Sequence, residues 1–360
     1  MVRTPTLRAV REERVAVLLN AQARSVTDAV RTDLARFVPP EDLYYSRTFR
    51  EAQSIARDVL DKSYDTVLTG GGDGTFCGFA NPILDLVSEA ASQARVAGGT
   101  VARGTSRLSA PRFGALRLGT GNALASFCGA SSRRTGVIED ILRTCAGDTP
   151  RTIDLHLVEV DGKRAPFAGL GFDAQVLNDY MRVKGALKLS ALKKLAATPA
   201  GYVWSGIMHT APRMLLKRDA EVEIVNEGAP AMQIGPDGRD LGRPIGTGEI
   251  LFRGKVSIAA AGTVPCYGFG YQIFPHALKS PGRFQLRLSA MGVFSAVRHI
   301  PTVWRGQTPE GVLDFHCERV RMRFSRPMPL QVGGDAEGYR DEVVIGMARE
   351  AARLVDFRRV

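Results

Sequence analysis

The first part of the chain alternates short apolar runs with segments whose apolar residues recur at helical spacing. Apolar or β-branched runs predict buried strands over residues 15–19, 66–69 and 113–118. Helical spacing of apolar residues predicts helices over 26–37 and 49–60. Alternating strands and helices favour a parallel sheet with helices on both faces, so this part of the chain is expected to be an α/β domain.

From about residue 152 the pattern changes to alternating or β-branched runs. One helical stretch, roughly 186–208, interrupts a series of predicted strands at 153–160, 222–225, 255–260, 284–288, 320–324 and 342–345. We therefore expect an α/β domain over residues 12–150 and a β-rich domain over residues 151–342. Residues 93–112, rich in small residues, predict a mobile loop within the first domain.

Composition restricts the functional class without choosing it. A chain of 360 residues exceeds one typical core, in agreement with two domains. The formal net charge of +11 favours acidic partners such as nucleic acid, anionic lipid or nucleotide. Five scattered cysteines without a C-x-x-C pair argue against a disulfide framework or a structural zinc site. No run approaches the roughly 20 apolar residues of a membrane span, so we expect a cytoplasmic protein.

A glycine-rich turn directly follows the second predicted strand. It reads Thr69-Gly70-Gly71-Gly72-Asp73-Gly74-Thr75. Consecutive glycines let backbone N–H groups face a ligand, and such a nest beside a helix N-terminus binds anions. Thr75 is placed to cap the helix that follows. Asp73 would repel a phosphate unless it acted through a metal ion or a hydroxyl proton, so the motif indicates phosphoryl transfer.

A second glycine turn follows the third predicted strand and reads Leu118-Gly119-Thr120-Gly121-Asn122-Ala123-Leu124-Ala125. Two such loops on neighbouring strand ends could hold both ends of a triphosphate, in the crevice at the carboxyl edge of a sheet. The sequence contains no G-x-x-x-x-G-K-[ST], no H-R-D and no D-F-G motif. P-loop enzymes and protein kinases are therefore excluded.

The paired turns resemble a known signature. Gly71–Thr75 followed by Gly119–Asn122 resembles the diacylglycerol kinase catalytic domain, whose family includes sphingosine kinases, ceramide kinases and bacterial lipid kinases. The resemblance extends along most of the chain, through Asn20–Arg24, Thr152–Asp154, Gly169–Ala174 and Gly268–Leu288. Near the C-terminus, Asp335-Ala336-Glu337 falls where the family carries D-G-E.

The resemblance implies a fold and a chemistry. It implies an ATP-binding α/β domain, a β-sandwich-like second domain, an active site in the cleft between them, and a return of residues 343–360 to the first domain. Asp73 and Glu337 would be the acidic groups nearest the transferred phosphoryl. We favour Glu337 as the base that accepts the lipid hydroxyl proton, and Asp73 is the alternative. The implied cofactors are ATP and Mg²⁺, with Asp73 and Asp335 as candidate metal ligands.

The residues expected to bind the nucleotide belong to three loops that follow predicted strands. They are Asn20, Arg24, Gly70, Gly71, Gly72, Gly74, Thr75, Gly119, Thr120, Gly121 and Asn122.

Two departures from the family pattern leave alternatives open. The family often has Asp where this chain has Ala123, and Asp-Gly where it has Pro281-Gly282. The metal arrangement is therefore open, and a non-catalytic nucleotide- or lipid-binding pseudokinase is one alternative. An NAD-kinase-like enzyme is another, since that family shares G-G-D-G-T, although its T-P-T-G-S-T-A-Y-like stretch is not found here.

The expected acceptor is a lipid at a membrane surface, not nucleic acid, and the protein would bind the membrane peripherally. Residues 181–194 place five basic side chains around apolar ones, which suits either anionic headgroups or a solvated helix face. The sequence does not distinguish diacylglycerol from monoacylglycerol, a sphingoid base or ceramide as the acceptor. It also leaves the oligomeric state open.

Overall fold

The computed structural model describes residues 13–23, 25–96, 109–171, 174, 220–268 and 270–358. Its first part is built on a parallel sheet in the order β2-β1-β3-β4. The strands are β1 (Val15–Asn20), β2 (Leu43–Ser46), β3 (Thr66–Gly71) and β4 (Arg112–Arg117). β3 is buried along its whole length, as expected of a parallel strand covered on both faces.

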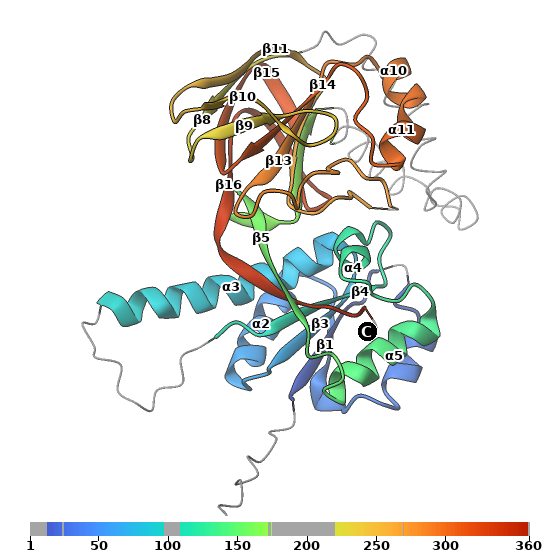
Figure 1. Cartoon of the computed structure of the whole chain (residues 1–360). Coiled ribbons are helices and arrows are strands. Elements are labelled where there is room, and N and C mark those ends of the chain that lie inside the picture. The colour runs from blue at the N-terminus through green and yellow to red at the C-terminus, as the bar shows by residue number, and fades with distance from the viewer. Residues whose placement is uncertain are drawn as a thin grey trace, which may run out of the picture.

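Helices cover this parallel sheet (Figure 1). They are α1 (Asp28–Leu34), the short helix η1 (Pro40–Asp42), α2 (Phe49–Asp61), α3 (Asp73–Val96), α4 (Ala123–Phe127) and α5 (Arg134–Cys145). α2 begins where the sequence supplies a capping box: the Thr48 hydroxyl accepts from Glu51 N, and the Glu51 carboxylate accepts from Thr48 N. The predicted α/β part with its parallel sheet is confirmed.

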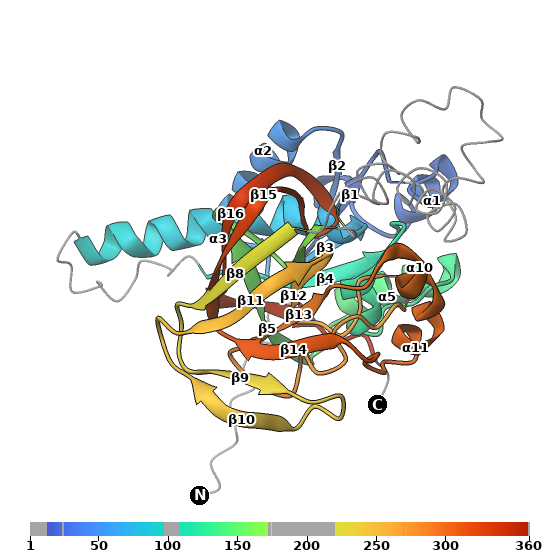
Figure 2. The ribbon, with the colours of Figure 1, turned by 90° about the horizontal axis from the view of Figure 1, so that it is seen from above.

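The second part is β-rich and its strands pair antiparallel. They are β5 (Thr152–Val160), β6 (Lys163–Ala165), β7 (Phe167–Gly171), β8 (Ala220–Asn226), β9 (Ala231–Ile234), β10 (Asp240–Ile245), β11 (Ile250–Val256), β12 (Ile258–Gly262), β13 (Phe284–Ser289), β14 (Val312–Cys317) and β15 (Arg319–Val332). Two short helices, α10 (Val293–Arg298) and α11 (Ile300–Trp304), connect β13 to β14. Figure 2 shows them on the side of the molecule opposite α3.

The last strand, β16 (Asp335–Val355), joins the two parts. It begins beside β15 in the second part and ends in the first, where Leu354 pairs in parallel with Phe113 of β4 (Figure 1). Its final residues also pair antiparallel with β5. Leu354 and Val355 are both fully buried there, so the C-terminal end of the chain is part of the core of the first part.

Several local predictions differ from the structure. The strand predicted over 255–260 is the end of β11 and the start of β12, which are separated by Ser257. The Ser257 hydroxyl donates to the carbonyls of Ser289 and Met291. Thr75 does not cap α3, which begins two residues earlier at Asp73. Residues 93–96 of the predicted loop are the last residues of α3, and 97–108 lie outside the described residues.

The predicted helix at 186–208 and the basic segment 181–194 also lie outside the described residues. Within the part of the chain that the structure does describe, no helix combines the length and apolar character needed to cross a bilayer.

Candidate functional site

The two glycine loops lie side by side at the carboxyl ends of β3 and β4. The strands pair up to Gly71 and Arg117, so both loops leave the same edge of the sheet. A Cβ atom on Gly119 would lie 2.7 Å from Gly71 C and closer still to the N and Cα atoms of Gly72. The loops are therefore in backbone contact, and only glycine fits at position 119 without separating them.

Asn122 gives the second loop its shape. Its backbone is left-handed, with φ 55°, a conformation that asparagine tolerates better than most residues. The side-chain Oδ1 accepts from Gly119 N at 2.9 Å, and Nδ2 donates to Gly119 O at 2.9 Å. The amide of Asn122 thus closes the loop on itself, which leaves the backbone of residues 119–121 to meet a ligand.

Asp73 connects the two loops. It is the first residue of α3, and its buried carboxylate accepts from Ala123 N at 3.0 Å and from Leu124 N at 2.8 Å. Burial raises the pKa of Asp73 above its ordinary value, while these two N–H groups act in the opposite direction. Both oxygens are committed to the first turn of α4, so the carboxylate holds the second loop against α3.

The loop after β1 reaches the same place. Asn20 Nδ2 donates to Thr75 Oγ1 at 3.0 Å, and Ser25 N donates to Leu118 O at 3.3 Å. Asn20 Oδ1 accepts from Gln22 N and so shapes its own loop. Three predicted nucleotide loops therefore meet at one edge of the sheet. Arg24 lies outside the described residues.

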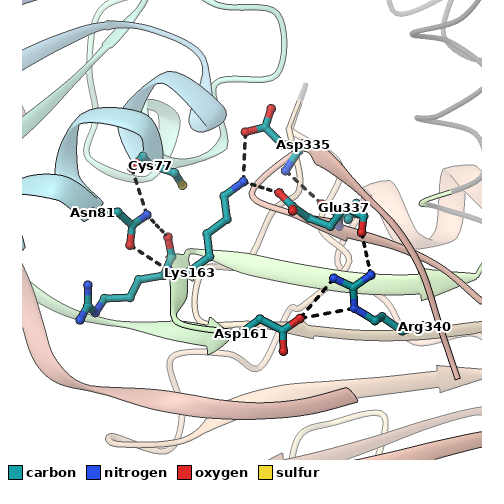
Figure 3. A network of polar contacts seen from close by, with 10 residues as sticks. Cys77, Asn81, Asp161, Lys163, Asp335, Glu337 and Arg340 are labelled. Carbon is teal, nitrogen blue, oxygen red and sulfur yellow. Dashed lines mark hydrogen bonds and ion pairs between the residues drawn. The ribbon is translucent and has the colours of Figure 1, made fainter. Parts of the chain in front are cut away.

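The start of β16, in the second part, brings the Asp335 carboxylate to the first of these loops and places Glu337 near it. A Cβ on Gly74 would lie 2.8 Å from Asp335 Oδ1, which places the Asp335 carboxylate against the first turn of α3. Lys163 of β6 donates to Glu337 Oε1 at 2.5 Å, and its Nζ lies 3.5 Å from Asp335 Oδ2. Figure 3 shows the Lys163 ammonium group between the two carboxylates. The side chain of Asp335 is half exposed, and those of Glu337 and Lys163 are about one-third exposed.

This arrangement shifts the pKa values of Asp335 and Lys163. Burial raises the pKa of Asp335, and Lys163 lowers it, with a net increase. For Lys163, partial burial lowers the pKa, but the hydrogen bond to Glu337 and the charges of both acids raise it overall. Lys163 is therefore a stable cation between the two acids. The Asp335 carboxyl is protonated more readily than an ordinary aspartate.

Lys163 was not among the residues predicted from sequence. The sequence Asp161-Gly162 could have indicated it, because Asp-Gly is typical of a two-residue β-hairpin turn. In the structure both residues have positive φ and form the tight turn between β5 and β6, which fixes the position of the lysine that follows. The turn also supports the acidic segment from the other side. Arg340 donates to the Glu337 carbonyl at 3.1 Å and lies 3.4 Å from Asp161 Oδ2 (Figure 3).

Asn81 of α3 fixes β6 against the first part. Its Nδ2 donates to Arg164 O at 2.8 Å, and its Oδ1 accepts from Arg164 N at 2.9 Å. Arg164 also pairs with Asp85 of α3 at 2.6 Å. Because Lys163 precedes Arg164, this contact sets the position of the ammonium group relative to the first turn of α3.

A loop of the second part lies against the second glycine loop. Gly268 has φ +144°, and a Cβ there would meet Gly121 Cα at 3.0 Å. Cys266 Sγ lies 3.7 Å from Ala123 O, and burial raises the pKa of its thiol to about 11. The other departure from the family pattern lies in an open turn, where Gly282 has φ 74° and Pro281 is exposed.

Asp335 and Asp73 are the candidate ligands for a magnesium ion. Among the described residues, no three His, Cys, Asp or Glu side chains gather as they would around a metal. Mg²⁺ is commonly held by one or two carboxylates together with substrate phosphates. Asp335 fits that role, since its carboxylate is half exposed beside the glycine loop. Asp73 fits less well, because each of its oxygens already accepts a backbone N–H.

The comparisons relate part of the chain to a known family. Residues 14–158 match the family model of the diacylglycerol kinase catalytic domain. Over these residues the chain is similar to the diacylglycerol kinase catalytic domain family, a family of lipid kinases. The comparison with curated proteins gave no match.

Solved structures agree with this fold. A diacylglycerol kinase from Bacillus anthracis str. Sterne has a TM-score of 0.61 at 14% identity, covering 96% of this chain and 97% of its own. A second structure from that organism, named a "putative diacylglycerol kinase", has a TM-score of 0.60 at 14% identity, with the same coverage. At this level of identity the similarity is one of fold, and it confirms the predicted fold class.

Proposed function

We propose that the chain is an ATP-dependent lipid kinase, which transfers the γ-phosphoryl group of ATP to a hydroxyl of diacylglycerol or a related lipid. The observation that carries this proposal is the convergence of two glycine loops, in backbone contact at Gly72 and Gly119, with the carboxylates of Asp335 and Glu337. The similarity of residues 14–158 to a family of lipid kinases supports the choice of nucleotide and of acceptor class.

The glycine loops would bind the phosphates of ATP. Their backbone N–H groups, together with the N-terminus of α3, favour negative charge without side chains in the way. Asp73 acts indirectly in this scheme: by accepting from Ala123 and Leu124, it holds the second loop in place. Asn122 serves the same purpose through Gly119.

Glu337 would accept the proton of the lipid hydroxyl. The lipid oxygen then forms a bond to the γ-phosphorus, the bond from that phosphorus to the β,γ-bridging oxygen breaks, and ADP leaves. Lys163 holds the Glu337 side chain in position by donating to its Oε1. Asp335 would hold a magnesium ion, which when bound neutralises charge on the phosphates.

A lipid acceptor also requires contact with a bilayer, so the proposal includes peripheral binding to a membrane from the cytoplasm. The basic segment 181–194 remains a candidate for that contact and lies outside the described residues.

Transfer of label from [γ-³²P]ATP tests this function. Purified protein is incubated with Mg²⁺ and mixed micelles that each carry one lipid: diacylglycerol, monoacylglycerol, a sphingoid base or ceramide. Detergent alone and excess EDTA serve as controls, and NAD is offered as a soluble acceptor. We expect label in one lipid class, in a metal-dependent reaction.

Two results would overturn the proposal. Label in NAD alone would assign an NAD-kinase-like activity to the chain. Binding of ATP without transfer to any acceptor would assign a non-catalytic module.

A further inference from the structure

The connection between β13 and β14 exposes large apolar side chains on the surface of the second part. Phe294 of α10 is 75% exposed, Trp304 of α11 is 43% exposed, and Val297 is 36% exposed. Val303, by contrast, is buried and anchors α11 to the body of the protein. Large apolar side chains that are exposed together mark a binding surface more often than single scattered ones do.

The same connection is basic. Residues 290–309 include Arg298 and Arg305 and contain no aspartate or glutamate. Both arginines are exposed, as are the aromatic residues beside them. Aromatic and arginine side chains together are typical of surfaces that lie between water and a bilayer. We call Phe294, Val297, Arg298, Trp304 and Arg305 the α10–α11 patch.

A series of contacts connects the α10–α11 patch to the candidate site. The Trp304 ring packs edge-on against Tyr271, with ring centroids 5.8 Å apart. Tyr271 N donates to Gly268 O at 2.8 Å, within the turn that also joins Tyr267 N to Tyr271 O. Gly268 in turn lies against Gly121 of the second glycine loop. A surface bound at the patch therefore lies beside the loop that would hold the phosphates.

We propose that the α10–α11 patch docks on an anionic membrane surface. This inference rests on the proposed function, because a lipid acceptor must be reached at the bilayer. The two arginines of the patch favour an anionic membrane over a second copy of the chain. Two copies would repel each other, since each carries a net charge of +11. Helices of six and five residues are too short to span a bilayer, so the patch lies at its surface.

Vesicle flotation without ATP tests the docking directly. The probes are extruded vesicles of phosphatidylcholine alone, and of phosphatidylcholine with about a third phosphatidylglycerol. Phe294→Ser should lower partitioning to the anionic vesicles on the order of tenfold. Arg298→Gln and Arg305→Gln should each lower it about fivefold on anionic vesicles and leave binding to neutral vesicles unchanged.

Phe49→Ser is the matched control. Phe49 is 64% exposed at the start of α2, in the other part of the molecule, so its replacement removes a similar apolar area. We expect Phe49→Ser to bind anionic vesicles as the parent protein does. Equal binding by Phe294→Ser and the parent, or an equal loss in both phenylalanine variants, would overturn the proposal.

The emission of Trp304 gives a second readout. In a Trp204→Phe background, Trp304 is the sole tryptophan, since the chain has two. Its fluorescence should shift to the blue on adding anionic vesicles, and an unchanged spectrum would contradict docking. A loss of dimer in Phe294→Ser on size-exclusion chromatography, with unchanged flotation, would instead assign the patch to self-association.

Turnover separates failure of docking from failure of the proposed function. Phe294→Ser should phosphorylate a dispersed short-chain lipid as fast as the parent and a vesicle-embedded lipid more slowly. Equal loss on both substrates would contradict a docking role. Vesicle binding by a protein that phosphorylates no lipid would refute the kinase proposal and leave the docking surface supported.

Discussion

Replacing Gly119 by alanine should separate the two glycine loops. The added Cβ would lie 2.7 Å from Gly71 C, and closer to two backbone atoms of Gly72, whereas ordinary van der Waals contact begins at 3.4 Å. The loops would have to move apart by about 0.7 Å or more, the difference between these two distances. The obstructing atoms are backbone, so no side chain can rotate away to relieve the contact.

The cost follows from what holds the loops together. Overpacking of a closely packed site costs about 1–3 kcal/mol. Movement also strains the hydrogen bonds from Ala123 and Leu124 to Asp73, each worth about 1 kcal/mol. We therefore expect Gly119→Ala to lower the free energy of unfolding by about 2–4 kcal/mol, which corresponds to a fall in Tm of roughly 4–16 °C. Nucleotide binding should be lost with it.

Two matched substitutions isolate the effect. Gly78 lies inside α3, where an added Cβ would meet no atom within 4 Å, so Gly78→Ala should stabilise by about 0.5–1 kcal/mol. A Cβ on Gly72 would meet its nearest neighbour at 3.7 Å, so Gly72→Ala should change Tm little. Thermal unfolding followed by circular dichroism and titration with a fluorescent ATP analogue measure both quantities. A Gly119→Ala variant with unchanged Tm and nucleotide affinity would show that close contact at Gly119 does not hold the two loops together.

Three further predictions concern other parts of this arrangement. Asn122→Ala removes both hydrogen bonds to Gly119 and leaves an alanine in the left-handed conformation. Urea unfolding should therefore show a free energy of unfolding lower by about 2 kcal/mol, and an unchanged midpoint would contradict this. Lys163→Met removes the cation that lowers the pKa of Asp335, which burial already raises. If ionised Asp335 is required, the acid limb of the kcat–pH profile should move to higher pH, with Lys163→Arg restoring it; an unmoved limb would be contrary evidence. Leu354→Asp buries a carboxylate between β4 and β5 and should lower stability by about 3 kcal/mol or more in thermal unfolding, whereas parental stability would argue against the role of β16.

The two glycine loops were predictable because each consists of consecutive residues. Gly70–Thr75 and Gly119–Asn122 each follow a buried strand, and adjacent parallel strands end at one edge of the sheet. Their juxtaposition therefore follows from strand order. What the sequence could not provide is the direction of the Asp73 carboxylate, which depends on how close α4 approaches α3.

The contacts between the two parts were not predictable for a different reason. Lys163 and Glu337 are 174 positions apart, and Asn81 and Arg164 are 83 apart, so no periodicity relates them. Strand β10 of the second part was also missed from the sequence, for a different reason. Five of the six residues of β10 are exposed and only Ile245 is partly buried, so this strand has no apolar alternation that would predict it, although it pairs with β9.

In the proposed function, the glycine loops and the first residues of β16 form one phosphoryl-transfer site, with Glu337 at the reacting hydroxyl. The most direct test is the rate of labelled phosphoryl transfer to lipid by Glu337→Gln, measured beside Glu342→Gln. Glu342 lies on the same strand, where it pairs with Arg321 and Arg323 at the surface. We predict a fall in kcat of about 10²-fold or more for Glu337→Gln and a rate near the parent's for Glu342→Gln. A Glu337→Gln variant that keeps the parental rate would show that Glu337 is not the base.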